Sequence, residues 1–114
     1  MSRILDISVT QEGESKIVVK LFGELDQLSL KDLKTELHAR SAEEVSLLIF
    51  DLEEVDFIAS AGLAIFAWYA DCFKKRGLGQ KLKVINCSEG VFRVFHLTML
   101  DEMIDVSPLD KETA

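Results

Sequence analysis

A serine at the start of an expected helix is the residue in this sequence best placed to do chemistry. Ser60 lies between two alanines, Ala59 and Ala61, and Gly62 follows them. An apolar run precedes this segment, so we expect a buried strand to end here and a helix to begin. The carboxyl ends of parallel strands are where α/β folds place their sites. The small neighbours would leave the Ser60 hydroxyl uncovered and open to modification.

The chemistry that suits this serine is phosphorylation by another protein. A helix start presents unpaired backbone N–H groups and a partial positive charge, which stabilise a phosphate. A phosphoryl group adds about −1.5 to −2 charge at neutral pH, enough to change how an apolar surface binds a partner. The structural alternative is that Ser60 is only an N-cap and that Gly62 only permits close packing. Spacing alone leaves both interpretations open.

The first half of the chain predicts a hairpin followed by a helix. Residues 4–10 and 16–22 are β-prone runs around a polar turn with a glycine, which indicates an antiparallel pair of strands. Residues 23–26 are expected to break the second strand. Ser29 is the expected N-cap of the helix that follows. The apolar stripe of that helix consists of leucines at helical spacing: Leu30, Leu33 and Leu37, with Leu28 as a further candidate.

The second half alternates expected strands and helices. Residues 45–52 are almost all apolar, which predicts a central strand covered on both faces. Residues 60–76 predict a second long helix, which ends at Gly77 and Gly79. A strand over 81–86, a helix over 88–97 and a short strand over 103–106 follow. The third helix is expected to pack through Val91, Val94, Phe95 and Leu97. This order predicts an α/β fold with a mixed, mainly parallel sheet and an N-terminal antiparallel hairpin.

The helix that begins at Ser60 is apolar on two sides. One set of residues should face the sheet: Leu63, Phe66, Ala67, Ala70 and Phe73. A second set falls roughly opposite: Ala64, Ile65, Trp68 and Cys72. A second apolar stripe that contains tryptophan indicates a docking face, because tryptophan is enriched at binding hot spots. The alternative is that a neighbouring helix or a dimer contact covers Trp68.

Two motifs resemble the signatures of bacterial anti-sigma factor antagonists, which are single-domain STAS proteins. Gly-Glu-Leu-Asp at residues 23–26 resembles the first signature. Val-Asp-Phe-Ile-Ala-Ser-Ala-Gly-Leu at residues 55–63 resembles the second, which commonly reads Asp-Ser-Ser-Gly-Leu. The resemblance covers nearly the whole chain, so it implies one STAS domain over residues 1–114, with a polar tail from about residue 108. It implies a STAS-type mixed sheet with helices packed on it.

The resemblance also implies a binding protein rather than an enzyme. In this family the unmodified antagonist captures an anti-sigma factor that is itself a serine kinase, and a sigma factor is released. Phosphorylation of the first serine of the second signature abolishes capture, and a PP2C-type phosphatase can restore it. Ser60 matches that serine by position, and Asp26 matches the acidic residue of the neighbouring loop. The expected partner-binding residues are Glu24, Asp26, Ala59, Ser60, Ala61, Gly62, Ala64, Ile65 and Trp68.

Two positions depart from the family pattern. Ala59 stands where the family has an aspartate, and Ala61 stands where it has a second serine. The kinase supplies the ATP and the metal, so phosphorylation does not require this aspartate. Its loss does remove a carboxylate that could orient the hydroxyl or the partner. The alternative function is therefore a constitutive STAS scaffold that no kinase modifies.

Composition limits the remaining classes of function. The chain has 114 residues and a formal net charge of −7, so we expect neither nucleic acid nor a membrane surface as a partner. No leader or spanning run is evident, which favours the cytoplasm, and Cys72 and Cys87 are expected to be reduced thiols. No cofactor is expected. A nucleotide-binding or weakly hydrolytic domain is a third hypothesis, since acidic residues 51–56 could hold Mg²⁺, but a phosphate loop is missing.

Overall fold

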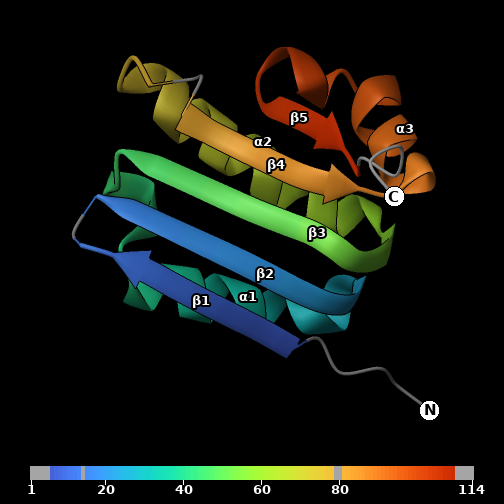
Figure 1. The fold of residues 1–114 in the computed structure, drawn as a ribbon, viewed down its shortest axis with the longest axis horizontal. Helices are drawn as coiled ribbons and strands as arrows, with labels where there is room; N and C mark the ends of the chain where they lie inside the picture. The colour runs from blue at the N-terminus through green and yellow to red at the C-terminus, as the bar shows by residue number, and fades with distance from the viewer. Residues whose placement is uncertain (1–5, 14, 79–80, 110–114) are drawn as a thin grey trace.

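The computed structural model describes residues 6–13, 15–78 and 81–109. Within them, five strands form one sheet whose spatial order follows the chain. They are β1 (Asp6–Glu12), β2 (Lys16–Leu25), β3 (Leu47–Ile58), β4 (Leu82–Cys87) and β5 (Asp105–Pro108). β1 runs antiparallel to β2, and every later pair is parallel (Figure 1). The expected mixed, mainly parallel sheet with an N-terminal hairpin is confirmed.

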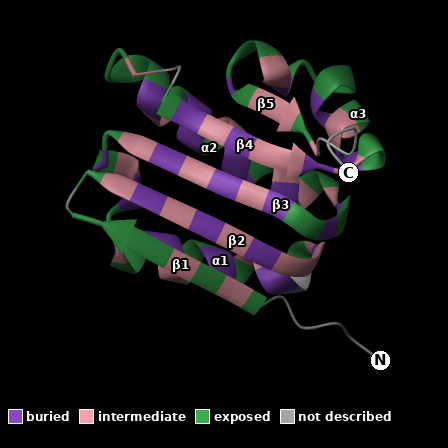
Figure 2. Cartoon of the chain, viewed as in Figure 1, coloured by how far each residue is buried: buried purple, intermediate pink, exposed green. Residues whose placement is uncertain are grey.

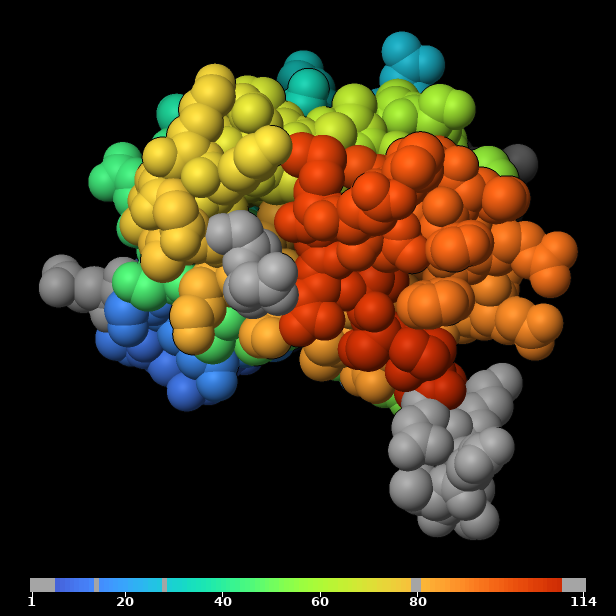
Figure 3. Space-filling view, turned by 90° about the horizontal axis from the view of Figure 1, so that it is seen from above, coloured from blue at the N-terminus to red at the C-terminus, as the bar shows by residue number. Residues whose placement is uncertain are grey.

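The helices connect the parallel strands. They are α1 (Gln27–Ala39), α2 (Ser60–Lys75) and α3 (Glu89–Leu97), with short 3-10 turns η1 (Ala42–Glu44) and η3 (Leu100–Glu102). α1 and α2 lie side by side behind the sheet (Figure 1). Viewed from above, α3 and β5 form a neighbouring part of the surface beside α2 (Figure 3). Because β2 and β3 are parallel, α1 and α2 both begin at the same edge of the sheet.

The sheet is covered by helices on one face only. Ile17 and Val19 of β2 and Leu48 and Phe50 of β3 are fully buried, whereas the residues between them are half-buried. This alternation is visible as bands along both strands (Figure 2). The expectation that residues 45–52 are covered on both faces is therefore wrong. Its source is the apolar character of the half-buried face, where Leu47 and Ile49 stand.

An aromatic cluster joins the sheet to two helices. The ring of Phe66 on α2 lies 5.0 Å from Phe50 on β3 and 5.2 Å from Phe95 on α3, both edge-to-face. Val91 and Phe95 of α3 are buried, as expected, and Val94 is half-buried. Leu97 is 71% exposed, so its expected packing is wrong. α3 ends at Leu97, and its last buried residue is Phe95, two positions earlier.

The second strand does not break where the sequence indicated. β2 continues through Leu25, with a shift of its register against β3 between Gly23 and Glu24. Gly23 has φ of +115°, a conformation that favours glycine, and such irregularities bend a strand without ending it. Gly77, with φ of +75°, follows α2 as expected. Four expectations lie outside the described residues: the first two positions of the 4–10 strand, the Leu28 side chain, Gly79 and the tail beyond residue 109.

Arg76 links the end of α2 to the segment before β3 through hydrogen bonds. Its Nη1 donates to the carbonyls of Glu43 and Val45, at 2.8 Å each, and its Nη2 donates to the Glu44 carbonyl at 2.9 Å. Since hydrogen bonds from charged donors are among the stronger ones, we expect Arg76→Met to lower the free energy of unfolding by about 1.5 kcal/mol, measured by urea denaturation. Lys75→Met is the control, because Lys75 forms an exposed ion pair with Asp71 and should matter little. Equal effects of the two variants would contradict this role of Arg76.

Candidate functional site

Ser60 is the first residue of α2, and it is exposed. The N-cap is Ala59, whose backbone is extended and whose side chain cannot cap the helix. The Ala59 N–H donates to the Leu25 carbonyl at 2.9 Å, which ties the end of β3 to the end of β2. The interpretation of Ser60 as an N-cap is therefore wrong. The serine stands one position further on, where its side chain has no capping role.

The Ser60 hydroxyl makes no hydrogen bond to any residue that the structure describes. In the first turn of α2, the N–H groups of Gly62 and Leu63 both donate to the Ala59 carbonyl, at 2.9 and 3.1 Å. The N–H groups of Ser60 and Ala61 precede this turn and have no acceptor within the described chain. The site thus combines an exposed hydroxyl with the positive end of a 16-residue helix.

Gly62 lets α2 pack directly against β2. It is buried, and a Cβ atom built on it would lie 2.9 Å from the Leu25 Cγ and 3.0 Å from the Leu25 carbonyl oxygen. Real Cβ atoms do not approach other atoms so closely, so only glycine fits here without a shift. The close-packing interpretation of Gly62 is confirmed. This packing also fixes the position of Ser60, two residues earlier.

The loop at the end of β2 forms the N-cap of α1. The Asp26 carboxylate accepts from the Ser29 N–H at 2.9 Å, and the Ser29 hydroxyl accepts from the Asp26 N–H at 3.0 Å. The Ser29 hydroxyl also donates to the Glu24 carbonyl at 3.0 Å. The expectation of Ser29 as the N-cap is wrong, because Ser29 is the third helical residue of a capping box. Since Leu25 pairs with Ile58, this loop and Ser60 lie at one edge of the sheet.

An exposed aromatic side chain three residues before Ser60 was not predicted from the sequence. Phe57 is 50% exposed and pairs with Glu24 across β2 and β3. The spacing of the buried residues in β3 explains this exposure. After Leu52, the buried positions change from a spacing of two to a spacing of three. Two exposed residues then follow each buried one, and Phe57 is the apolar residue among them. It adds an apolar group to the edge that carries Ser60.

The exposed side of α2 continues from Ser60. Ala64 and Trp68 follow at helical spacing, and both are exposed, Trp68 by 55%. Ile65 is only 3% exposed, so its expected place on the outer face is wrong. α1 lies against that side of α2 and covers Ile65 together with Tyr69, which the sequence reading did not assign. The other residues fall where expected: Phe66, Ala70 and Phe73 are buried, Leu63 and Ala67 pack partly against the core, and Cys72 is half-buried.

Both cysteines are free thiols, as expected. Cys87 is buried at the end of β4, and burial raises its pKa to about 12. Cys72 has a pKa that is raised by its surroundings, with desolvation first and the charge of Asp71 second. Neither thiol is activated as a nucleophile. In the described part of the chain, no helix is long and apolar enough to cross a membrane.

Comparison with known proteins agrees with this geometry. The model of the STAS domain family matches residues 7–113. The chain belongs to the STAS domain family. An anti-sigma-B factor antagonist of Bacillus subtilis (strain 168) is 34% identical over 97 residues, which cover 85% of this chain and 86% of that protein.

Solved structures of other proteins share this fold. An anti-sigma factor antagonist from Mycobacterium paratuberculosis superposes with a TM-score of 0.73 at 27% identity, covering 91% of this chain and 86% of that one. The Bacillus cell fate determinant SpoIIAA in its phosphorylated form superposes with a TM-score of 0.66 at 17% identity, covering 95% of both chains. The STAS-type fold expected from the two motifs is confirmed.

Proposed function

We propose that this protein is an anti-sigma factor antagonist that binds a kinase-type anti-sigma factor and is switched off by phosphorylation of Ser60. The observation that carries the proposal is the exposed hydroxyl of Ser60, which is free of hydrogen bonds within the described chain and stands at the start of α2. The name of the Bacillus subtilis relative supports the binding role. SpoIIAA, whose fold this chain shares, has been solved in a phosphorylated form.

The partner surface in this proposal is the exposed side of α2 together with the edge of the sheet beside it. Ala64 and Trp68 extend it along the helix, and the exposed ring of Phe57 extends it onto β3. The loop with Glu24 and Asp26 borders it, with the Asp26 carboxylate held by α1. Unmodified, this surface presents the exposed side chains of Phe57, Ala64 and Trp68, which suit an apolar contact. When it is bound to this surface, the anti-sigma factor releases the sigma factor that it had held.

Phosphorylation works in this proposal through charge and desolvation. The Ser60 Oγ attacks the γ-phosphorus of ATP on the kinase; a new O–P bond forms, the bond to ADP breaks, and the hydroxyl proton passes to a base of the kinase. The phosphate then meets the positive end of α2, which stabilises the product. To bind again, a partner would have to remove water from the charged phosphate on Ser60, which is unfavourable. Hydrolysis by a PP2C-type phosphatase restores the hydroxyl, and the whole cycle takes place in the cytoplasm.

A constitutive scaffold is the second candidate function. Ala59 favours it, because no carboxylate precedes Ser60 to orient the hydroxyl or the kinase. Such a scaffold would bind its partner through the same surface and would never be modified.

Mass spectrometry after incubation with the anti-sigma factor and ATP separates the two functions. We expect one phosphate, located on Ser60, and loss of the complex in parallel. Ser60→Ala should stay unmodified and bound, which controls for phosphorylation elsewhere. A stable complex with unmodified Ser60 after exhaustive incubation with ATP would favour the scaffold.

A further inference from the structure

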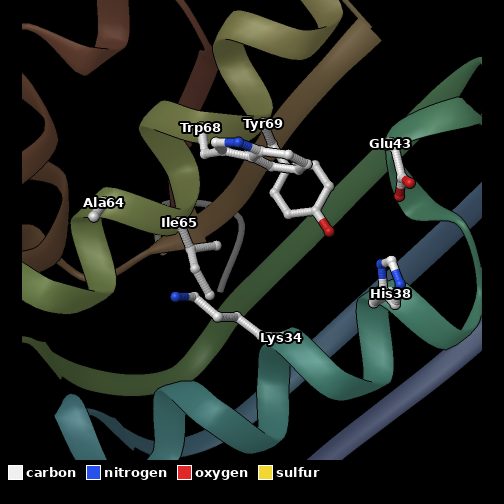
Figure 4. A pocket seen from close by; sticks show the side chains of 7 residues that line it. All are labelled: Lys34, His38, Glu43, Ala64, Ile65, Trp68 and Tyr69. Atoms are coloured by element: carbon white, nitrogen blue, oxygen red, sulfur yellow. The ribbon is translucent and has the colours of Figure 1, made fainter.

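A groove between α1 and α2 adjoins the proposed partner surface and shares Ala64 and Trp68 with it. It has a volume of about 450 Å³, within the range of small-molecule pockets. α2 forms one wall, α1 forms the other, and η1 closes one end (Figure 4). The lining residues are Lys34, His38, Glu43, Ala64, Ile65, Trp68 and Tyr69. The wall from α2 is apolar, whereas the side chains from α1 and η1 are polar.

Tyr69 brings a hydrogen-bonding hydroxyl to this groove. The residue is only 5% exposed, and its ring packs edge-to-face against Trp68 at 4.9 Å and Phe50 at 6.4 Å. Its hydroxyl points into the groove, toward the side of His38 and Glu43 (Figure 4), and makes no hydrogen bond within the part of the chain that the structure describes. Burial, and after it the charge of Glu43, raises the pKa of Tyr69, so the phenol is a hydrogen-bond donor at neutral pH. An acceptor on a ligand in the groove would gain a hydrogen bond from this donor.

The charges lie at opposite ends of the groove. The Lys34 amino group lies beside Ile65, and the Glu43 carboxylate lies at the other end, near the Tyr69 hydroxyl (Figure 4). Lys34 forms no ion pair within the described residues. Between the two ends stand the apolar side chain of Ile65 and the rings of Trp68 and Tyr69. A ligand that complements this groove has an anion at one end, a flat apolar body, and a hydroxyl at the other end.

We propose that the groove binds a small hydroxyaryl carboxylate. The carboxylate meets the Lys34 ammonium, and the aromatic ring lies against Ile65 and Trp68. The ligand hydroxyl accepts from the Tyr69 O–H and donates to the Glu43 carboxylate. His38 borders this polar end, where its imidazole offers one further nitrogen. Binding of such a ligand requires neither an anti-sigma factor nor phosphorylation of Ser60.

The fluorescence of Trp68 can test this proposal directly, since Trp68 is the only tryptophan in the chain. Titration of the isolated protein with 3-(4-hydroxyphenyl)propionate, with excitation beyond the absorption of phenols, should give a saturable change. 3-Phenylpropionate, which lacks the hydroxyl, should bind about tenfold more weakly. Tyr69→Phe should bind the hydroxylated probe about tenfold more weakly, and should bind 3-phenylpropionate as wild type does.

Lys34 tests the other end of the groove. Lys34→Gln should weaken binding of the hydroxylated probe about fivefold, whereas Lys31→Gln, on the same helix but outside the groove, should leave it unchanged. Circular dichroism and urea midpoints equal to wild type establish that the variants are folded. An absent saturable signal, or Tyr69→Phe and Lys34→Gln variants that bind as wild type does, overturns the proposal. The titration contains no partner protein, so its failure leaves the switch at Ser60 unaffected.

Discussion

Ser60→Asp is expected to weaken binding of the anti-sigma factor about a hundredfold, whereas Ser60→Ala keeps the affinity of the unmodified protein. A carboxylate at the first residue of α2 places a charge where a partner would have to desolvate it, and mismatched interfacial charge costs several kcal/mol. A hundredfold change corresponds to about 2.7 kcal/mol. The alanine variant loses only a hydroxyl that has no hydrogen bond within the described chain. Isothermal titration calorimetry with the purified anti-sigma factor measures both affinities.

The matched control for this experiment is Ser46→Asp. Ser46 is exposed and lies directly before β3, whereas Ser60 follows the other end of the same strand. The control adds the same charge to the same acidic chain at the opposite edge of the sheet, so it should bind as wild type does. If Ser60→Asp and Ser60→Ala bind equally well, the switch mechanism is wrong. If Ser46→Asp weakens binding as much as Ser60→Asp, the effect is one of net charge.

The N-cap of α1 shows which features of the fold the local sequence predicts and which depend on contacts between distant segments. Asp26 and Ser29 are both good caps, and each has a residue three positions on that could complete a capping box: Ser29 for Asp26 and Asp32 for Ser29. The decision depends on where β2 ends, and that depends on its pairing with β3 up to Leu25 and Ile58. The helix could therefore be predicted from its leucines, and its first residue could not.

The outer side of α2 gives a second example. The helical period places Ile65 and Trp68 on the same broad side, away from Phe66. The neighbouring position of α1 then decides that Ile65 is buried and that Trp68 remains exposed. The helical period did carry a signal for Tyr69, which lies four residues after Ile65 and three after Phe66 on the buried side of α2. The exposure of Ser60 followed from its small neighbours and from the strand before it, so it could be predicted.

Gly62→Val is expected to lower the free energy of unfolding by about 3 kcal/mol, because β-branched atoms would have to enter a contact that already excludes a Cβ. The Leu25 carbonyl oxygen, at 3.0 Å from the ideal Cβ, belongs to the backbone of β2 and cannot move aside as a side-chain end could. Urea denaturation measures the loss. Gly90→Ala in α3 is the control: its Cβ would meet nothing within 4 Å, so helix propensity should stabilise the protein by about 0.5 kcal/mol.

The same pair of variants separates a packing role of Gly62 from a direct contact with a partner. A packing role predicts that Gly62→Val loses stability and partner affinity together, since the shift of α2 away from β2 carries Ser60 and Trp68 with it. A direct contact predicts lost affinity with unchanged stability, because the added methyl groups would then lie in the interface. The buried position of Gly62 against Leu25 favours the first outcome. A stable Gly62→Val variant with weakened binding would show instead that the first turn of α2 can shift without cost and that the partner contacts residue 62 itself.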